Sequence, residues 1–430
     1  MSDTRGVPAQ PAVPSDPIPA TAHVLVVGAG PGGAAAATYA ARAGLDVVLV
    51  DSARFPRDKT CGDGLTPRAV TELDRLGLGD WLADAPRLDG LSLSGWGGHA
   101  QIPWPRGRFA PYGSAVRRTE LDDRIRRLAV AAGVTMVQGA KAVDAEIGSA
   151  GIESVTLRTD SGTRSIRPNR VIVADGVRSA LGKALGRTWH RDTPYGVAAR
   201  AYCESGRAGD HWMGSHLELR GPEQELLAGY GWLFPLGTGA DGVGRLNIGV
   251  GTLATSRRPA DLALRPVLGH YYRSRRDDWE LTTPPAEITS ALLPMGGAVS
   301  GVAGPNWMLI GDAAACVNPL NGEGIDYAIE TGRLAIEALD GGDFSRAWPA
   351  TLTEHYGLAF AAARRFATVL TMPKAVPVLG RPGIRVHALM AVAVRVMGNL
   401  MTEDDKDLVA RAWRTIGRTA TTIESRPPFT

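Results

Sequence analysis

The sequence has little that would cross-link it covalently or hold a metal ion. Its 430 residues include three cysteines, Cys61, Cys203 and Cys316, with no C-x-x-C pair, and eight scattered histidines. An odd number of unpaired cysteines argues against a disulfide framework and favours a reducing compartment. Because cysteines and histidines do not cluster, we predict no metal site.

Strong charge and long apolar runs are missing as well. A net charge of +3 is too small to predict a nucleic-acid partner. No run of 18 apolar residues occurs, so we expect no segment to span a bilayer. Residues 1–20 are rich in proline and alanine and lack the apolar stretch of a signal peptide. We therefore expect a disordered tail there.

Glycine, by contrast, is abundant, and one group of glycines indicates a nucleotide site. The apolar run HVLVVG predicts a strand, and DVVLVD predicts a second strand that ends at Asp51, followed by Ser52. Between them lies a loop that opens a helix and contains Gly28, Gly30, Pro31, Gly32 and Gly33. Such a loop lets the backbone approach a pyrophosphate at the helix N-terminus, and the acid can accept a ribose hydroxyl. The pattern predicts a dinucleotide-binding β-α-β unit; the alternative is a glycine-rich packing turn.

Two later segments favour FAD as the dinucleotide. ADGVRS, with Asp175, and GDAAACVNPLNGEGID, with Gly311 and Asp312, each follow a predicted buried strand. Asp312 can hold a ribityl hydroxyl. The second segment should open a helix near Gly322, whose N-terminal dipole would stabilise reduced flavin. The further cofactor candidates in that turn are Gly324 and Ile325.

Arg118 precedes a helix expected over 119–132, with Thr119 and Asp122 forming a capping box. Arg118 can reach the cofactor from this position, or it can be an ordinary surface arginine.

The loop RDKTCGDGLTP, residues 57–67, comes shortly after the second strand and can fold back over the flavin. Its cofactor-binding candidates are Lys59, Cys61, Gly62, Asp63 and Gly64. The glycines allow the backbone to pass close to the isoalloxazine ring.

From residue 22 onward, the chain resembles the geranylgeranyl reductase family of flavoproteins. The resemblance rests on GAGPGG, RDKTCGDGL, ADG and GDAAACVNPLNGEGID in this order, and on GYGWLFPL followed by LNIGVG. CGDGLTPRAV, LLPMGGAVSGV and the basic C-terminal helices most resemble the actinobacterial members that act on menaquinone. The resemblance implies FAD as cofactor and menaquinone as substrate. It also implies saturation of one isoprenoid C=C bond, in the second isoprene unit from the ring.

The fold implied is the p-hydroxybenzoate-hydroxylase-like FAD fold of the α/β class. It combines a Rossmann-type FAD domain, a β-sheet substrate domain and C-terminal helices. We expect the FAD domain to comprise residues 21–80, 112–185 and 293–344. We expect the substrate domain to comprise residues 81–111 and 186–292, and a helical region to follow at 345–430.

The chemistry of an isolated alkene suggests roles for particular residues. Because no carbonyl can accept negative charge, hydride transfer should be coupled to protonation in a dry site with aromatic walls. Cys61 corresponds to the active-site loop of the family, and it can assist protonation or simply pack against the flavin. The aromatic candidates are Trp96, Trp104, Tyr230, Trp232 and Phe234, with Pro235 beside them; each can equally be a core residue. Trp232 is favoured as catalytic because it belongs to the family motif.

The substrate implies a membrane partner. Residues 372–401 are apolar, interrupted by proline and flanked by Arg381, Arg385 and Arg395. This pattern fits an element that lies in the cytoplasmic face of the cell membrane, or a core helix. No second nucleotide fingerprint identifies the electron donor.

Three other functions stay open at this point. The first is reduction of geranylgeranyl diphosphate or other isoprenoid lipids, and the second is a non-catalytic isoprenoid carrier with structural FAD. The third is a flavin monooxygenase or halogenase, which the absence of a W-x-W-x-I-P or GDAAH motif disfavours.

Overall fold

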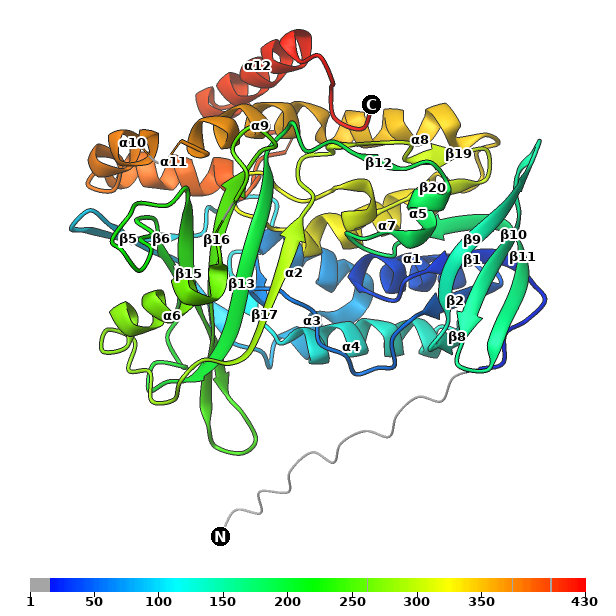
Figure 1. Cartoon of the computed structure of the whole chain (residues 1–430), viewed down its shortest axis with the longest axis horizontal. Coiled ribbons are helices and arrows are strands. Elements are labelled where there is room, and N and C mark those ends of the chain that lie inside the picture. The colour runs from blue at the N-terminus through cyan, green and yellow to red at the C-terminus, as the bar shows by residue number, and fades with distance from the viewer. Residues whose placement is uncertain (1–15, 261, 373, 403) are drawn as a thin grey trace.

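The computed structural model describes residues 16–430 except 261, 373 and 403, and leaves the side chains of 375, 376 and 379 undescribed. Figure 1 shows two lobes side by side, with the last helices running along one edge of both. One lobe is built around a largely parallel sheet and the other around a curved, largely antiparallel sheet. This architecture agrees with the predicted FAD fold.

The first lobe contains an eight-stranded sheet. Its parallel strands run in the order β20 (Trp307–Leu309), β11 (Gly162–Val173), β1 (Thr21–Val27), β2 (Val47–Asp51) and β8 (Thr135–Gln138). The antiparallel strands are β19 (Ala303–Gly304), β9 (Lys141–Gly148) and β10 (Gly151–Thr159). The central strands are continuous valine, leucine and isoleucine runs because their side chains are buried on both faces of the sheet.

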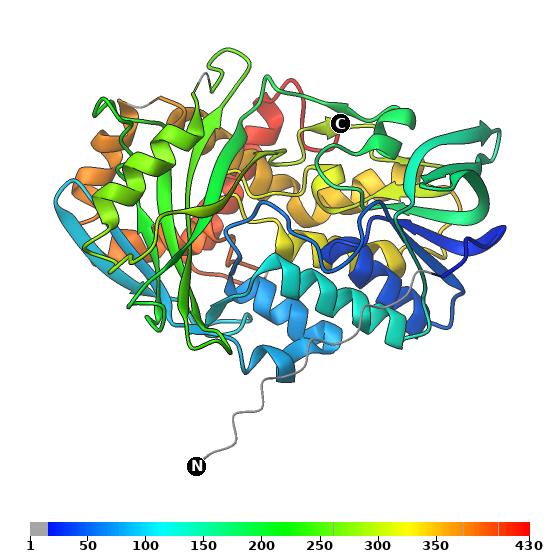
Figure 2. The ribbon, with the colours of Figure 1, turned by 60° about the horizontal axis from the view of Figure 1, so that its bottom comes forward.

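Helices α1 (Pro31–Arg42), α4 (Arg118–Ala131) and α7 (Ile325–Glu337) belong to this lobe, as do α2 (Pro67–Leu73), α3 (Gly79–Leu82) and α5 (Ala180–Ala184). Short helical turns lie at Asp74–Leu78 and Gly311–Ala314. Figure 2 shows α1 and α4 from the side. The predicted capping box is wrong: α4 begins at Arg118, and its N-cap is Arg117, which makes no capping hydrogen bond through its guanidinium. Asp122 instead binds two arginines, as described below.

The second lobe is a seven-stranded sheet in the order β17-β13-β16-β15-β14-β5-β6. Its strands are β5 (Gly90–Gly95), β6 (Gly98–Pro103), β13 (Tyr195–Glu204), β14 (Trp212–His216), β15 (Gly229–Thr238), β16 (Gly244–Ala254) and β17 (Ala286–Leu293). Helix α6 (Leu264–Arg275) packs on one face, where Leu233, Ile248 and Tyr271 share a core. The opposite face is directed to the first lobe.

Two small sheets join the lobes. One consists of β3 (Gly64–Leu65), β7 (Gly113–Ala115) and β4 (Arg87–Leu88), and the other of β12 (Thr188–Trp189) and β18 (Val299–Ser300). Strand β5 pairs with β14, so residues of segment 81–111 lie in the same sheet as those of segment 186–292. The division into domains by residue bounds stays a prediction.

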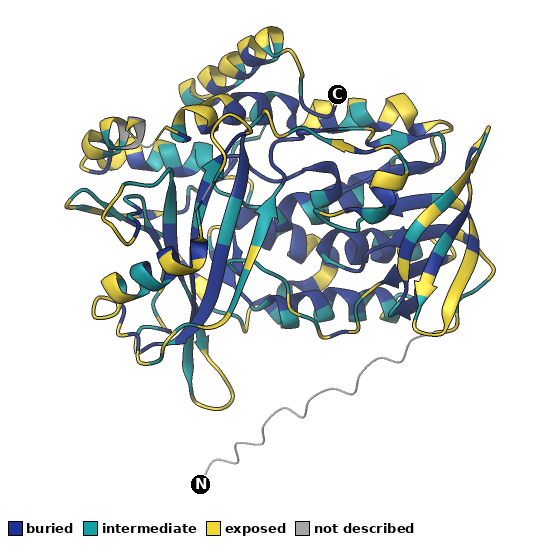
Figure 3. Cartoon of the chain, in the orientation of Figure 1, coloured by how far each residue is buried: buried dark blue, intermediate teal, exposed yellow. Residues whose placement is uncertain are grey.

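The C-terminal region is helical. It comprises α8 (Phe344–Leu352), a turn at Thr353–Gly357, α9 (Leu358–Leu370), α10 (Ala375–Gly383), α11 (His387–Met397) and α12 (Leu408–Ile423). Figure 3 shows many exposed residues on the outer sides of α10 and α12. Within the described residues, no helix is both long enough and apolar enough to cross a membrane.

The prediction of a disordered tail over residues 1–20 is wrong for residues 16–20. The N–H of Asp16 donates to the carbonyl of Met136 at 2.9 Å, and the Asp16 carboxylate accepts from the N–H of Met136 at 2.9 Å. Ile18 packs against the core of the first lobe. Residues 16–20 therefore contact the FAD lobe, while residues 1–15 lie outside the described part of the protein.

Candidate active site

The predicted nucleotide motifs meet at one edge of the parallel sheet. Gly28 follows β1, Asp51 ends β2, Asp175 follows β11 and Gly311 follows β20. These strands run parallel, so their carboxyl ends lie at the same edge. In open α/β sheets, this edge is where nucleotides bind.

Close approach of backbones explains the glycines of the first loop. Gly28 has φ +102°, and a Cβ there would lie 2.3 Å from the carbonyl oxygen of Ala174. A Cβ on Gly33 would lie 1.8 Å from the carbonyl oxygen of Gly28. Helix α1 starts at Pro31 with Gly30 as its N-cap, and because glycine offers no capping oxygen, the first N–H groups can bind an anion. Asp51 accepts from the N–H groups of Ala29 and Ala53, both at 2.7 Å.

A single large cavity starts at this edge. Its volume is about 1840 Å³, beyond the roughly 300–1,000 Å³ of a typical small-molecule pocket. It extends from the glycine loop, past Cys61 and strand β15, to helices α9, α11 and α12. Its far end is lined by apolar side chains such as Phe366, Leu389, Met390, Trp413 and Ile416.

The loop around Cys61 packs directly on aromatic residues of β15. A Cβ on Gly62 would lie 3.2 Å from both Trp232 Nε1 and the Phe234 ring, so glycine allows this approach. The Sγ atom of Cys61 accepts from the N–H of Asp63 at 3.3 Å. Burial raises the pKa of Cys61, although the positive charge of Arg118 acts against it. Cys61 is therefore a neutral thiol at neutral pH.

A buried polar network holds this loop in place. Asp63 Oδ2 accepts from Tyr202 Oη at 2.7 Å and from Asn247 Nδ2 at 2.9 Å. Asn247 Nδ2 also donates to the carbonyl of Cys61 at 2.9 Å, and Asn247 Oδ1 accepts from Trp232 Nε1 at 2.9 Å. One asparagine therefore positions both the Cys61 backbone and the Trp232 ring.

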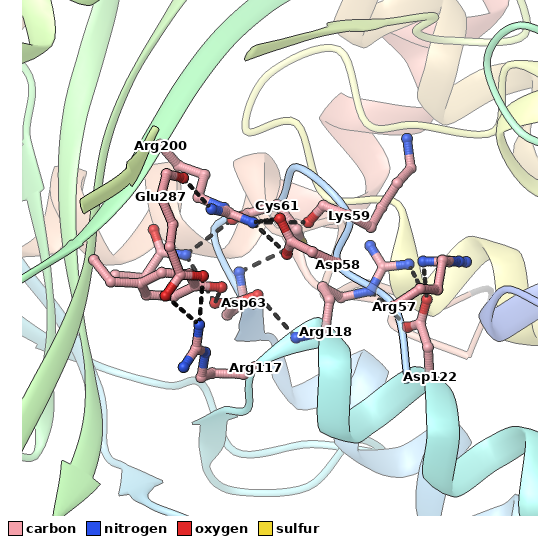
Figure 4. Close-up of polar contacts among 12 residues, drawn as sticks. Arg57, Asp58, Lys59, Cys61, Asp63, Arg117, Arg118, Asp122, Arg200 and Glu287 are labelled. Carbon is pink, nitrogen blue, oxygen red and sulfur yellow. Dashed lines mark hydrogen bonds and ion pairs between the residues drawn. The ribbon is translucent and has the colours of Figure 1, made fainter. Parts of the chain in front are cut away.

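Figure 4 shows how charged residues fix the start of the loop. Asp58 pairs with the buried Arg200, whose Nη1 donates to the carbonyl of Glu287 at 2.7 Å. Arg57 lies 2.8 Å from Asp122, which also accepts from Arg118 at 2.6 and 2.8 Å. Arg118 lines the cavity and its guanidinium is held by Asp122, so its contact with the cofactor stays a prediction.

The aromatic wall follows from strand alternation. Tyr230, Trp232 and Phe234 point to the cavity, with ring centroids 5.9 and 6.2 Å apart along the series. Tyr230 Oη donates to the carbonyl of Asn321 at 2.7 Å, which ties the wall to the loop before α7. Trp96 lines the far part of the cavity against α10, and Trp104 Nε1 donates to the carbonyl of Leu88 at 3.0 Å.

Comparisons with known proteins place the chain in a family. The FAD binding domain family model matches residues 21–201. A menaquinone reductase from Mycobacterium tuberculosis is 58% identical over 412 residues, which represent 95% of this chain and 98% of that protein. The chain belongs to the menaquinone reductase family. Another member, from Mycolicibacterium smegmatis, is 57% identical, over 95% of this chain and 99% of its own.

More distant matches are found in sequence and in fold. A digeranylgeranylglycerophospholipid reductase from Methanopyrus kandleri is 29% identical, over 81% of this chain and 90% of its own. The structure of a geranylgeranyl bacteriochlorophyll reductase-like protein from Thermoplasma acidophilum superposes with a TM-score of 0.74 at 21% identity, over 92% of this chain and 99% of that one.

FAD is the cofactor of this menaquinone reductase family member, which is an FAD-dependent oxidoreductase, and the cavity fits FAD. The glycine loop and the uncapped N-terminus of α1 suit its pyrophosphate. Asp175 Oδ1, which is buried and has no hydrogen-bond partner in the described structure, offers an unused acceptor in the cavity wall. The lining includes most of the predicted FAD residues, namely Gly28, Gly30, Pro31, Gly32, Asp51, Ser52, Lys59, Cys61, Gly62, Gly64, Arg118, Asp175, Gly311, Asp312, Gly322, Gly324 and Ile325.

Three predicted site residues do not line the cavity in the described structure. Gly33 packs under the glycine loop, and Asp63 is buried in the polar network. Pro235 lies on the opposite face of β15 from Trp232 because successive side chains of a strand alternate. Helix α7 begins at Ile325, three residues after the predicted start.

Sequence reasoning missed Asn247, Tyr202 and Glu323. Asn247 does carry a signal, since it is a polar residue in the middle of the apolar run RLNIGVG. A buried amide requires hydrogen-bond partners, and this requirement could have marked Asn247 as part of a network. Glu323 also carries a signal, since it is the carboxylate between Gly322 and Gly324 in the segment expected at the flavin. Tyr202 lies in a strand whose contact with Asp63 only the structure reveals.

Proposed function

We propose that this chain reduces menaquinone by saturating one C=C bond of its isoprenoid tail, in the second unit from the ring. The observation that carries the proposal is the continuous cavity. It joins the FAD-binding edge of the sheet to an apolar opening among the C-terminal helices. A long apolar tail can enter from that opening and place an alkene beside Cys61 and the aromatic wall.

The residues around Cys61 and the aromatic wall suit reduction of an alkene. When bound, reduced FAD supplies hydride. Protonation of the alkene would place positive charge on the tertiary carbon that accepts this hydride, and the rings of Trp232 and Phe234 can stabilise that charge. The cavity as a whole is lined mainly by apolar groups, which favours exclusion of the water that could intercept this charge.

Access to the substrate requires contact with a membrane, because the tail is dissolved there. Moving one CH₂ group from hydrocarbon into water costs about 0.8 kcal/mol, so exposing one isoprene unit costs about 4 kcal/mol. We propose that α9 to α12 dock on the cytoplasmic face of the cell membrane. Except for Ile147, the large apolar residues that are exposed in the described structure lie between positions 366 and 423.

Basic side chains in the same region support docking on an anionic surface. Arg381, Arg385, Arg411 and Arg418 are exposed. Arg395, also expected to flank the interfacial element, instead forms ion pairs with Asp405 and Asp407 at 3.0 and 2.7 Å.

The test uses the purified FAD-loaded protein, reduced anaerobically with dithionite and mixed with menaquinone in liposomes. The quinone ring is then reoxidised in air, and the product is examined by mass spectrometry. We expect the product to retain two added hydrogens, with fragmentation placing them in the second isoprene unit. If the two added hydrogens are lost when the ring is reoxidised, only the ring was reduced, and the proposal would be wrong. Parallel reactions with geranylgeranyl diphosphate and geranylgeranyl lipids test the alternative substrates.

A further inference from the structure

Glu323 occupies the turn between the short helix Gly311–Ala314 and α7, between Gly322 and Gly324. Its backbone is fixed on both sides: the N–H donates to Asn321 Oδ1 at 2.9 Å, and the carbonyl accepts from the N–H of Asn318 at 2.8 Å. The residue lines the cavity. The same turn is held to the aromatic wall by the hydrogen bond from Tyr230 Oη to the Asn321 carbonyl. Glu323 is therefore a fixed part of the cavity wall.

The carboxyl group of Glu323 is unusual in its surroundings. Oε1 is buried and has no hydrogen-bond partner among the described residues. An ionised carboxylate in such a place would lose more hydration than its neighbours replace, so the neutral acid is favoured. Burial raises its pKa well above the ordinary value, and the negative charge of Asp326 raises it further. The N–H groups of Asp326 and Ile325 and the charge of Arg118 act in the opposite direction.

Glu323 lines the same cavity as Cys61 and Tyr230, and Tyr230 is hydrogen-bonded to Asn321, two residues before Glu323. Burial raises the pKa of Cys61 and of Tyr230, and an ionised Glu323 would raise both further. Carboxyl, thiol and phenol groups have ordinary pKa values of about 4.3, 8.5 and 10. Burial raises the pKa of all three here. Burial therefore does not make the thiol or the phenol more acidic than the carboxyl, and the carboxyl is the best proton donor of the three.

We propose that Glu323 is the catalytic acid that protonates the substrate alkene, while Cys61 shapes the wall beside it. This inference rests on the proposed function. The proton moves from the Glu323 carboxyl to one alkene carbon, and the π electrons form the new C–H bond. The hydride supplied by reduced FAD forms a C–H bond at the other carbon, so the alkene gains two electrons and FAD is oxidised. The carboxylate left behind recovers a proton from water once the product has gone.

The kinetic test compares Glu323→Gln with two controls. Glu354→Gln changes an exposed glutamate outside the cavity lining, and Cys61→Ala removes the competing proton donor. Rapid-quench single turnovers, read as saturated product per bound FAD, should slow by about 10²–10⁴-fold in Glu323→Gln, the usual contribution of a general acid. Glu354→Gln should match wild type. The single-turnover rates of wild type and of Cys61→Ala should decrease at high pH, because Glu323 ionises. Glu323→Asp should react more slowly than wild type but show the same decrease at high pH.

A second readout needs neither FAD nor turnover. The infrared spectrum of the FAD-free protein at neutral pH should contain a protonated-carboxyl band that Glu323→Gln lacks.

The pH dependence of the free energy of unfolding should also distinguish wild type from Glu323→Gln. The folded-state pKa of Glu323 is raised, so its stabilising contribution is present below the unfolded pKa and is lost as the pH rises through the folded pKa. The free energy of unfolding of wild type should therefore fall relative to Glu323→Gln as the pH rises above about 4.

The outcomes separate this inference from the proposed function. If wild type yields saturated product but Glu323→Gln forms it at the wild-type rate, Glu323 is not the acid and the reductase function stands. If Cys61→Ala is the variant that loses the decline at high pH, the thiol is the donor and the inference is wrong. If wild type forms no saturated product, the proposed function itself fails, whatever the infrared spectrum shows.

Discussion

At the scale of single residues, Asn247 connects the two candidates that the sequence had identified. Its amide makes two donor contacts and one acceptor contact, to the Cys61 carbonyl, to Asp63 and to Trp232. The resemblance to the family motifs predicted Cys61 and Trp232 as site residues. It did not indicate that a single residue positions both of them. Long-range hydrogen bonds of this kind join residues 186 positions apart, and no local pattern encodes them.

The thiol of Cys61 can be tested apart from its backbone. We expect Cys61→Ala to keep its full content of FAD, because the loop is held mainly through Asp63, Asn247 and Arg200. Turnover should fall by about tenfold or more, which corresponds to ~1.4 kcal/mol of lost contact with the reacting alkene. Product formation and the ratio of flavin to protein absorbance measure the two properties. Unchanged turnover at full FAD content would remove any chemical role of the thiol.

At the scale of secondary-structure elements, β16 supports the aromatic wall through two glycines on the same face. A Cβ on Gly249 would lie 2.0 Å from the Trp232 ring, whereas a Cβ on Gly251 would lie 3.5 Å from it. We expect Gly249→Ala to displace Trp232 and to reduce turnover by about 10²-fold, as a misplacement of about 1 Å at an active site can do.

Gly251→Ala is the matched control, because 3.5 Å is an ordinary contact distance. Both variants should bind FAD, and tryptophan fluorescence should shift in Gly249→Ala alone. Equal activity in the two variants would show that the position of Trp232 is unimportant for the reaction.

The elements themselves were largely predictable, whereas their ends were not. Buried apolar runs followed by glycine and acid motifs predicted β1, β2, β11 and β20, and with them the FAD-binding edge. The start of α7 was predicted three residues too early because glycines do not mark a first helical turn. The capping box at Thr119 was wrong because the arginines of α4 and of the loop take Asp122 as their partner.

At the scale of the whole molecule, the cavity depends on contacts that the sequence does not display. Segment 81–111 joins the second sheet through parallel pairing of β5 with β14, two strands far apart in the sequence. The C-terminal helices attach to the loop before α7, where Asn318 Nδ2 donates to the Met397 carbonyl at 2.7 Å. Composition indicated that the last helices were apolar and basic, but only the fold shows that they line the same cavity as the FAD site.

Helix α12 is the strongest candidate for contact with the membrane. Leu408, Ile416 and Ile423 fall on one side of it at helical spacing, and Arg411 and Arg418 flank them. Leu408 is 82% exposed and Ile423 is 64% exposed, and neither lines the cavity. Burying a leucine or isoleucine contributes about 1.5–3 kcal/mol. The double variant Leu408→Glu/Ile423→Glu should therefore bind phosphatidylglycerol vesicles roughly 10²-fold more weakly or worse, as measured by co-sedimentation.

Ile147 provides the control, since it is 58% exposed but lies on β9, at the far side of the FAD lobe. Ile147→Glu adds a negative charge and removes an exposed apolar group, yet it should bind vesicles like wild type. In detergent, where the tail needs no bilayer, the double variant should saturate menaquinone at the wild-type rate. Loss of activity in liposomes alone would then assign α12 to substrate access. If the double variant pellets with vesicles as well as Ile147→Glu does, α12 does not contact the membrane.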